Sequence, residues 1–306
     1  MYLKPKKFYE EQNIEIILDS YVEEIDRKKS QLTFSKDKAH KNIEYDNLVI
    51  ATGTEARLMP IENPDLQGIH YLRSIDDVEM IKSSLKGSKN MVIIGGGYIG
   101  LEVAAVANTL GLNVTVVEMA SRILERVTSP TISSFYNSFH VSRGVKILTN
   151  TLVQGINGDN RVSSVETSSG SIDADIVIVG IGVLPCQALA EDAGIKVDNG
   201  IVVDEFCKTS DDYIFSAGDC TLHPSHFYNK NIRLESVHNA IEQGKTVASS
   251  IIGEKVSYNQ IPWFWSDQYE LKLQIAGLNN DYDEYVIRGN LDENSFSVFY
   301  FKSGYM

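Results

Sequence analysis

The sequence predicts an α/β fold organised around a parallel β-sheet. Apolar strands are expected at 91–94, 114–117 and 145–148, and helices at 98–110 and 129–143 alternate with them. A glycine-rich turn joins the first of these strands to the first helix. This strand–helix–strand–helix–strand order predicts a Rossmann-like domain, in which helices cover both faces of a parallel sheet.

The residues before this domain predict mostly antiparallel strands. A short helix is expected at 5–11, followed by a strand over the alternating apolar residues Ile14, Ile16 and Leu18 and a second strand at 31–34. An apolar strand at 48–50 comes next. Residues 73–85 predict a helix, because apolar residues recur at helical spacing after two aspartates in the first turn.

The residues after the parallel sheet predict further strands and one long helix. Meandering strands are expected over 161–178, with an apolar end at 176–179. Shorter strands are expected at 201–203 and 214–217, and a helix at 237–251. From Pro262 to Met306 the sequence is rich in aromatic residues and predicts antiparallel strands.

Composition excludes several classes of protein. The 306 residues carry a formal net charge of −13, which disfavours nucleic acid and anionic membrane surfaces as partners. No apolar run approaches the roughly 18 residues of a membrane span, and the charged first 11 residues do not resemble a secretory signal. The three cysteines, Cys186, Cys207 and Cys220, have no CxxC spacing, so we expect a reducing, cytoplasmic location.

The strongest motif is Gly95-x-Gly97-x-x-Gly100, with Tyr98 and Ile99 at its centre. It follows an apolar strand and opens a helix, which is the context of a dinucleotide-binding turn. In that role the first glycine permits the tight turn, the second lets a pyrophosphate approach the backbone, and the third lets the helix pack closely on the sheet. The helix N-terminus would then attract the phosphates.

Glu118 strengthens this interpretation. It ends the second strand, 18 residues after Gly100, near the offset expected for the acid that binds a ribose 2′-hydroxyl. A carboxylate there would repel a 2′-phosphate, so NAD(H) is favoured over NADP(H). Arg122 and Arg126 follow, and each could approach the cofactor or be a solvated surface arginine.

Further segments extend the pattern along the whole chain. They are 48–53 (LVIATG), 92–102 (VIIGGGYIGLE), 179–185 (VGIGVLP), 209–219 (TSDDYIFSAGD), 234–240 (LESVHNA) and 262–268 (PWFWSDQ). In these segments the sequence resembles the FAD-dependent pyridine nucleotide-disulfide oxidoreductases, in particular their ferredoxin (rubredoxin, putidaredoxin) reductase branch. The last two segments carry most of the resemblance to that branch.

The resemblance implies two cofactors, FAD and NAD(H), and assigns residues to each. The residues implied for FAD are Ala51, Thr52, Gly53, Arg73, Gly218, Asp219, Val237, Val22 and Trp265 or its neighbour Trp263. Those implied for the NADH pocket are Glu102, near the nicotinamide, with Glu118, Arg126 and Gly182. Alternatives remain from the residues themselves: Val22, Val237 and the tryptophans could be core, and Asp219 a turn residue.

The sequence departs from this family at both ends. No flavin-binding GxGxxG precedes residue 48, and the chain stops shortly after a strand expected at 296–301. We therefore expect a fragment that binds NADH but lacks bound flavin. The expected domains are an incomplete FAD-domain part at 1–53, an NAD(H)-binding domain at 54–186, an FAD-domain return at 187–261 and the beginning of an α+β C-terminal domain at 262–306.

The resemblance implies an NADH-dependent flavoprotein reductase that passes electrons through FAD to a ferredoxin- or rubredoxin-type iron–sulfur protein. No side chain is expected to act as a catalytic acid or base, because the cofactors carry the chemistry. One alternative is an NADH oxidase or a disulfide or peroxide reductase of the same superfamily. Another is a non-catalytic NAD-binding module similar to apoptosis-inducing factor. His223-x-x-His226 has metal-like spacing, but a loop is favoured there over a metal site.

Overall fold

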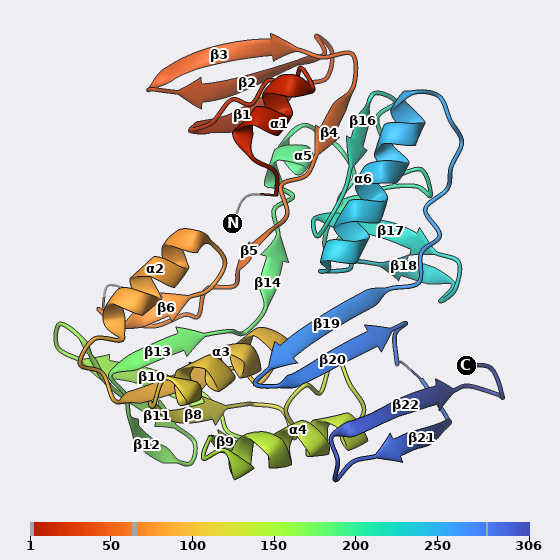
Figure 1. The fold of residues 1–306 in the computed structure, drawn as a ribbon. Coiled ribbons are helices and arrows are strands. Elements are labelled where there is room, and N and C mark those ends of the chain that lie inside the picture. Colours follow the sequence, from red (N-terminus) through yellow and green to blue (C-terminus); the bar gives the residue numbers. More distant parts are fainter. Residues whose placement is uncertain (1–2, 63–65, 280) are drawn as a thin grey trace. The chain divides into compact units, whose positions relative to one another are not determined.

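The computed structural model describes residues 3–62, 66–279 and 281–306. The chain divides into two compact units (Figure 1). Unit 1 comprises Met1–Glu55 and Leu184–Pro262, and unit 2 comprises Ala56–Val183 and Trp263–Met306. The boundaries that the sequence suggests at residues 53, 186 and 261 stay predictions.

Unit 2 contains the parallel sheet. Its strands are hydrogen-bonded in the order β6 (Ile69–Tyr71), β13 (Ile176–Val179), β7 (Asn90–Ile94), β8 (Asn113–Val117) and β9 (Lys146–Leu148), and every neighbouring pair is parallel. Its helices are α2 (Ile75–Ser84), α3 (Tyr98–Thr109) and α4 (Pro130–Ser142). The predicted strand–helix alternation is therefore confirmed, with ends that differ by at most two residues.

The two faces of this sheet are covered differently. Met91 and Ile93 of β7 pack in one cluster with side chains of α2, α3 and α4, whereas Val92 and Ile94 pack in another with Val165 of β11. The second face is covered by an antiparallel meander of β10 (Val153–Gly158), β11 (Val162–Thr167) and β12 (Gly170–Asp173) (Figure 1). The prediction of helices on both faces is wrong, because the chain returns from β9 to β13 through strands.

Local capping explains where two of these helices begin. Ser74 and Asp77 form a capping box at α2, in which each side chain accepts a hydrogen bond from the other's backbone N–H. At α4 the Ser129 hydroxyl accepts from the N–H of Ile132, and Pro130 occupies the first helical position. Both starts can be read from the sequence.

The C-terminal residues of unit 2 form two hairpins. β19 (Trp263–Gln268) pairs with β20 (Leu271–Ala276), and β21 (Glu284–Asn290) pairs with β22 (Ser295–Phe301), both antiparallel as predicted. The Tyr300 hydroxyl is 2.6 Å from the Ser129 hydroxyl of the α4 cap. This part of the chain therefore packs on the parallel-sheet domain.

Unit 1 combines parallel and antiparallel strand pairs with two short helices and one long helix. β4 (Leu48–Ile50) and β16 (Ile214–Ser216) are parallel, and the antiparallel sheet has the order β1 (Ser20–Asp26), β2 (Gln31–Lys36), β3 (Ala39–Glu44). The remaining elements are α1 (Lys6–Glu11), α5 (Ala188–Asp192), α6 (Val237–Ile251), β15 (Ile201–Val202), β17 (Thr221–Ser225) and β18 (Lys230–Ile232). Where the chain passes between the units, β5 (Thr54–Ala56) pairs with β14 (Val183–Pro185).

The strand expected over Ile14, Ile16 and Leu18 is wrong. These residues lie in an extended segment outside any strand, and all three side chains are exposed. The partner of β2 is instead β1, in the register Asp26↔Gln31. Apolar alternation produces a strand only where a neighbouring strand accepts its hydrogen bonds.

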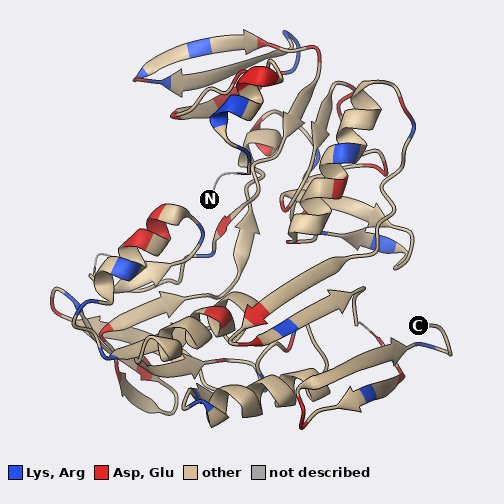
Figure 2. Cartoon of the chain, in the orientation of Figure 1, with Lys and Arg blue, Asp and Glu red and all other residues tan. Residues whose placement is uncertain are grey.

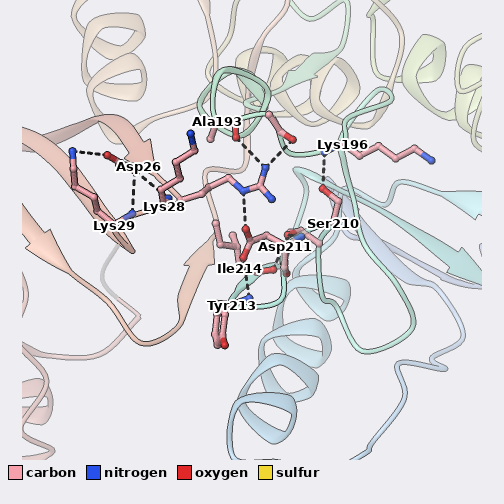
Figure 3. Close-up of polar contacts among 12 residues, drawn as sticks. Asp26, Lys28, Lys29, Ala193, Lys196, Ser210, Asp211, Tyr213 and Ile214 are labelled. Atoms are coloured by element: carbon pink, nitrogen blue, oxygen red, sulfur yellow. Dashed lines mark hydrogen bonds and ion pairs between the residues drawn. The ribbon is translucent and has the colours of Figure 1, made fainter.

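Arg27, in the turn after β1, links the three-stranded sheet to the rest of unit 1. Figure 3 shows the polar contacts around its partner Asp211. Its Nε donates to Asp211 Oδ2 at 2.7 Å, and its Nη1 donates to the carbonyl of Gly194 at 3.2 Å. Burial opposes ionisation of Asp211, but hydrogen bonds from the Tyr213 N–H and from Arg27 hold the pKa of that carboxyl below its usual value. The contact is partly exposed, so we expect about 1 kcal/mol from it.

Charge is unevenly distributed along the chain. Residues 1–44 carry nine Lys or Arg and nine Asp or Glu, so the whole net charge of −13 lies on residues 45–306. Figure 2 shows both signs mixed on α1, where Lys6 and Glu10 are 3.5 Å apart. In the described parts of the chain, no helix has both the length and the apolar character needed to cross a membrane.

Candidate cofactor-binding sites

The glycine motif of unit 2 forms the turn between β7 and α3. Gly95 has a φ of +108°, and a side chain there would collide with the carbonyl of Gly180, directly after the neighbouring strand β13. A Cβ on Gly100 would collide with the carbonyl oxygen of Gly95. Gly97 is the N-cap of α3. A Cβ on Gly97 would have no other atom of the described residues within 4 Å. Two glycines therefore serve the turn, and the third leaves the backbone open to a ligand.

Glu118 lies at the same sheet edge, since Val117 and Ile94 are register partners. Its Oε2 accepts from the Gly96 N–H at 2.7 Å and its Oε1 from the Ala120 N–H at 2.8 Å. A carboxylate has about four acceptor positions, so these two bonds orient the group and leave capacity for hydroxyl donors. The arrangement fits a ribose diol and disfavours a phosphate.

The two residues within the motif differ in their surroundings. Ile99 is 47% exposed, beside the open Gly97. Tyr98 is half-buried, donates to the Val127 carbonyl at 3.4 Å, and has a pKa raised by burial. Tyr98 therefore packs the motif against the loop between β8 and α4.

The two arginines after Glu118 have different roles. Arg122 donates through Nη1 to the Thr128 carbonyl and through Nη2 to the Glu125 carbonyl, both at 2.9 Å. These two bonds hold the half-buried Arg122 against its own loop. Arg126 is exposed, and its Nη2 lies 3.7 Å from the position of a Cβ on Gly182, whose φ is +105°. The structure thus brings Arg126 and Gly182 together.

The remaining predicted residues of unit 2 lie on α3, before α2 and on β19. Glu102 is half-buried on α3 and accepts from the Ser266 hydroxyl at 2.6 Å. Arg73 is exposed, and its backbone N–H donates to Asp77 at 2.9 Å. Trp263 and Trp265 are 40% and 41% exposed, with ring centroids 5.5 Å apart, so the alternative that they are core residues is wrong.

In unit 1 the ends of two parallel strands bring the predicted flavin segments together. Ile50 and Ser216 are register partners, and the Ser216 hydroxyl donates to the Ile50 carbonyl at 2.8 Å. Residues 51–53 and 217–219 follow directly. Gly53 and Gly218 have φ values of +67° and +87°, which favour glycine. Adjacent carboxyl ends of parallel strands are where α/β folds bind nucleotides, so Ala51, Thr52, Gly53, Gly218 and the half-buried Asp219 fit a flavin nucleotide.

Gln243, on α6, holds the turn at Gly218 in place, and the sequence did not reveal this role. It is fully buried, and its Oε1 accepts from the Gly218 N–H at 2.7 Å and from the Thr221 hydroxyl at 2.8 Å. Its Nε2 donates to His223 Nδ1 at 3.1 Å. The available signal was Asn239 and Gln243 at i, i+4, two polar residues on the inner face of a predicted helix.

The two valines implied for FAD differ in exposure. Val237 is 55% exposed at the start of α6, which contradicts the core alternative. Val22 is half-buried beside a β-bulge in β1. Their contact with a cofactor stays a prediction, as does that of every residue assigned above.

The histidines of the His223-x-x-His226 pair have separate partners. His223 is buried against Gln243, whereas His226 is exposed and lies 3.1 Å from Glu205. Burial lowers the pKa of His223 to about 4.

This depressed pKa predicts a pH dependence of stability. An unfolded histidine has a pKa of about 6.5, so the unfolded chain takes up a proton first as the pH falls. The contribution of His223 is therefore fully present above pH ~6.5 and is lost towards pH 4, by about 2 to 3 kcal/mol between pH 7 and 4.5. Urea unfolding at pH 7 and pH 4.5 measures the free energy of unfolding at each pH. Between these two values it should fall by about 2 to 3 kcal/mol less in His223→Asn than in the unaltered protein. The same loss of unfolding free energy in both proteins would contradict this role of His223.

Two protein families match this chain. Residues 4–244 match the family described as pyridine nucleotide-disulphide oxidoreductase, and residues 263–306 match the reductase C-terminal family. Rhodocoxin reductase from Rhodococcus erythropolis is 42% identical over 98% of this chain and 70% of its own length. Putidaredoxin reductase CamA from Pseudomonas putida is 41% identical over 98% of this chain and 72% of its own length.

Solved structures agree with these relatives. The ferredoxin reductase for the CYP199A2 system from Rhodopseudomonas palustris superposes with a TM-score of 0.95 at 39% identity, covering 98% of this chain and 74% of that chain. The reductase of a covalent putidaredoxin reductase–putidaredoxin complex gives 0.94 at 40% identity, covering 99% and 74%. The chain therefore belongs to the pyridine nucleotide-disulphide oxidoreductase family, in the ferredoxin reductase branch that its sequence predicts.

Proposed function

We propose that this chain is an NADH-dependent flavoprotein reductase that passes electrons through FAD to a ferredoxin- or rubredoxin-type iron–sulfur protein. The observation that carries the proposal is the similarity to rhodocoxin and putidaredoxin reductases, which spans 98% of the chain in each case. The open turn at Gly97 and the oriented carboxylate of Glu118 support the nicotinamide half of the proposal.

The residues of unit 2 would bind and orient NADH. The N–H groups at the start of α3, opened by Gly97, would receive the pyrophosphate, and Glu118 would accept from ribose hydroxyls. Arg126, Gly182 and Glu102 are proposed to line the rest of the pocket. When bound, NADH supplies a hydride, and FAD takes up the electron pair and releases it one electron at a time.

The residues of unit 1 would hold FAD. The carboxylate of Asp219 is suited to accept from sugar hydroxyls, and the turns at Gly53 and Gly218 would place backbone groups against the nucleotide. Val22, Val237, Arg73 and Trp265 are proposed as further contacts on the family resemblance alone. The protein itself need only position the cofactors, so no acid–base residue is assigned.

We also propose a cytoplasmic location. Cys207 and Cys220 are buried thiols, and burial raises the pKa of Cys207 to about 12, which keeps it protonated and unreactive. Unpaired cysteines are typical of a reducing compartment.

The experiment is to follow NADH oxidation by the flavin-loaded protein with different acceptors. Reduction of a [2Fe–2S] ferredoxin or a rubredoxin, with a rate that depends strongly on salt, is expected for an acidic protein docking a charged carrier. Consumption of oxygen, peroxide or a disulfide alone would indicate an oxidase or a disulfide reductase. NADH binding without turnover would indicate a non-catalytic module.

Glu118 provides a test of nucleotide choice. Glu118→Gln removes the negative charge but keeps the size of the side chain, so we expect a roughly tenfold loss of NADH affinity and a smaller preference over NADPH. Both dissociation constants can be measured from nucleotide fluorescence. Glu125→Gln is the control, because Glu125 is exposed and bonded to Ser121. If the ratio of the NADH and NADPH dissociation constants were unchanged in Glu118→Gln, Glu118 would not contact the nucleotide ribose.

A further inference from the structure

A continuous chain of hydrogen bonds runs through the interior of unit 2 and ends at Glu102. His140 Nε2 on α4 is 2.8 Å from Gln268 Oε1 on β19, and Gln268 Nε2 donates to the Ser266 hydroxyl at 3.1 Å. The Ser266 hydroxyl donates to Glu102 Oε1 on α3 at 2.6 Å. His140, Gln268 and Ser266 each have 0% exposure. Buried polar side chains are stable in a protein interior when their hydrogen-bonding groups have partners, and the bonds between these three residues supply such partners.

The His140 imidazole determines which group donates and which accepts in each of these hydrogen bonds. Burial lowers the pKa of His140, against the opposing effect of the Gln268 hydrogen bond, so the ring is neutral. Because Gln268 Oε1 can only accept, the single ring proton lies on Nε2. Nδ1 is then a bare lone pair, and no partner for it exists among the described residues.

The opposite direction would be less stable. If the Gln268 amide were flipped, its NH₂ group would face His140. The His140 Nε2 would then accept a hydrogen bond, and the ring proton would move to His140 Nδ1. A buried N–H without an acceptor would result, which costs more than a buried lone pair without a donor. His140 therefore fixes the orientation of the Gln268 amide.

The fixed amide in turn orients Ser266. The Gln268 N–H occupies a lone pair of the Ser266 oxygen, so the hydroxyl hydrogen is directed at Glu102. The 2.6 Å separation is typical of a hydroxyl bonded to a carboxylate. The result is a Glu102 side chain held as an acceptor in one orientation.

We propose that His140, Gln268 and Ser266 are positioning residues that hold the negative charge of Glu102 beside a bound dinucleotide and favour NAD⁺ over NADH. The inference rests on the proposed function. Glu102 lies five residues after Gly97 on α3, about 7.5 Å along the helix axis, within reach of a dinucleotide bound at that end. The oxidised nicotinamide ring is a cation and the reduced ring is neutral, so a fixed carboxylate stabilises the first selectively. The same charge would stabilise the ring as hydride leaves.

The test is the ratio of the NAD⁺ and NADH dissociation constants, measured by calorimetry without an electron acceptor. Glu102→Gln should weaken NAD⁺ binding roughly tenfold and leave NADH binding within about twofold. Ser266→Ala should shift the ratio in the same direction by roughly three- to fivefold. Ser142→Ala is the matched control, because this exposed serine also donates one hydrogen bond, to the Phe139 carbonyl.

A double variant separates positioning from a general structural role. Ser266→Ala added to Glu102→Gln should change the ratio no further, since the serine acts through the carboxylate. His140→Phe, which frees the Gln268 amide to flip, should give a smaller shift in the same direction and serves if Ser266→Ala does not fold. Equal losses for both nucleotides, or an unchanged ratio, would overturn the proposal. Failure of the unaltered protein to bind either nucleotide would instead contradict the proposed function.

Discussion

Gly100→Ala is expected to weaken NADH binding by roughly 100-fold. Its methyl group would meet the carbonyl oxygen of Gly95, which is backbone and cannot rotate away. Helix α3 must then move away from the turn, which costs on the order of 3 kcal/mol of folding stability for overpacking. The shift also displaces the N–H groups that would receive the pyrophosphate, and a loss of about 3 kcal/mol of binding free energy corresponds to about two powers of ten in affinity. NADH titration and thermal unfolding would both report the change, because the strain is present without ligand.

Gly97→Ala is the matched control, since it adds the same methyl group three residues earlier. Gly97 has a φ of −81°, and the space around a Cβ there is open. Stability without ligand should change by less than about 1 kcal/mol, while NADH binding should weaken because the methyl group occupies the space through which the pyrophosphate approaches. If Gly97→Ala binds NADH normally, the dinucleotide does not lie over this turn. If Gly100→Ala binds NADH and unfolds like the unaltered protein, neither binding nor stability requires the close approach of α3 to the turn.

The parallel-sheet domain could be predicted because its signals are local. Residues 91–94 of the strand before Gly95 are buried on both faces and therefore all apolar, and the turn after it needs glycines at fixed spacing. Helix α6 was predicted with the bounds Val237–Ile251 that the structure shows, since Ser236 caps its start. These features depend on neighbours within one turn or one strand.

Features that depend on distant partners could not be predicted. The alternation over Ile14–Leu18 looks like a strand until the pairing of β1 with β2 is known. The second face of the sheet needs a partner, and the sequence order alone did not show that the meander of β10–β12 supplies it. The His140–Gln268 bond spans 128 residues and the Gly218–Gln243 bond joins a turn to a helix, so neither leaves a pattern in a short window.

Gln243→Leu is expected to destabilise unit 1 by about 4 kcal/mol, because it leaves several buried groups without partners. The Gly218 N–H, the Thr221 hydroxyl and the His223 ring nitrogen all bond to this one amide. Leucine nearly matches the volume of glutamine, so the loss reflects hydrogen bonds and not a cavity. Urea unfolding would measure it. Lys245→Leu, on the same helix but exposed and paired with Glu242, should cost less than about 1 kcal/mol.

The same substitution should also affect FAD, because Gln243 holds the N–H of Gly218 next to Asp219. Gln243→Glu separates the two effects. Its carboxylate keeps an acceptor for Gly218 and Thr221 but cannot donate to His223 Nδ1, so the imidazole must place a proton there. We therefore expect Gln243→Glu to retain more flavin than Gln243→Leu, measured by flavin absorbance per polypeptide after loading with FAD. Equal flavin content in the two variants would mean that the orientation of Gly218 does not determine binding, and that Gln243 serves the stability of unit 1 alone.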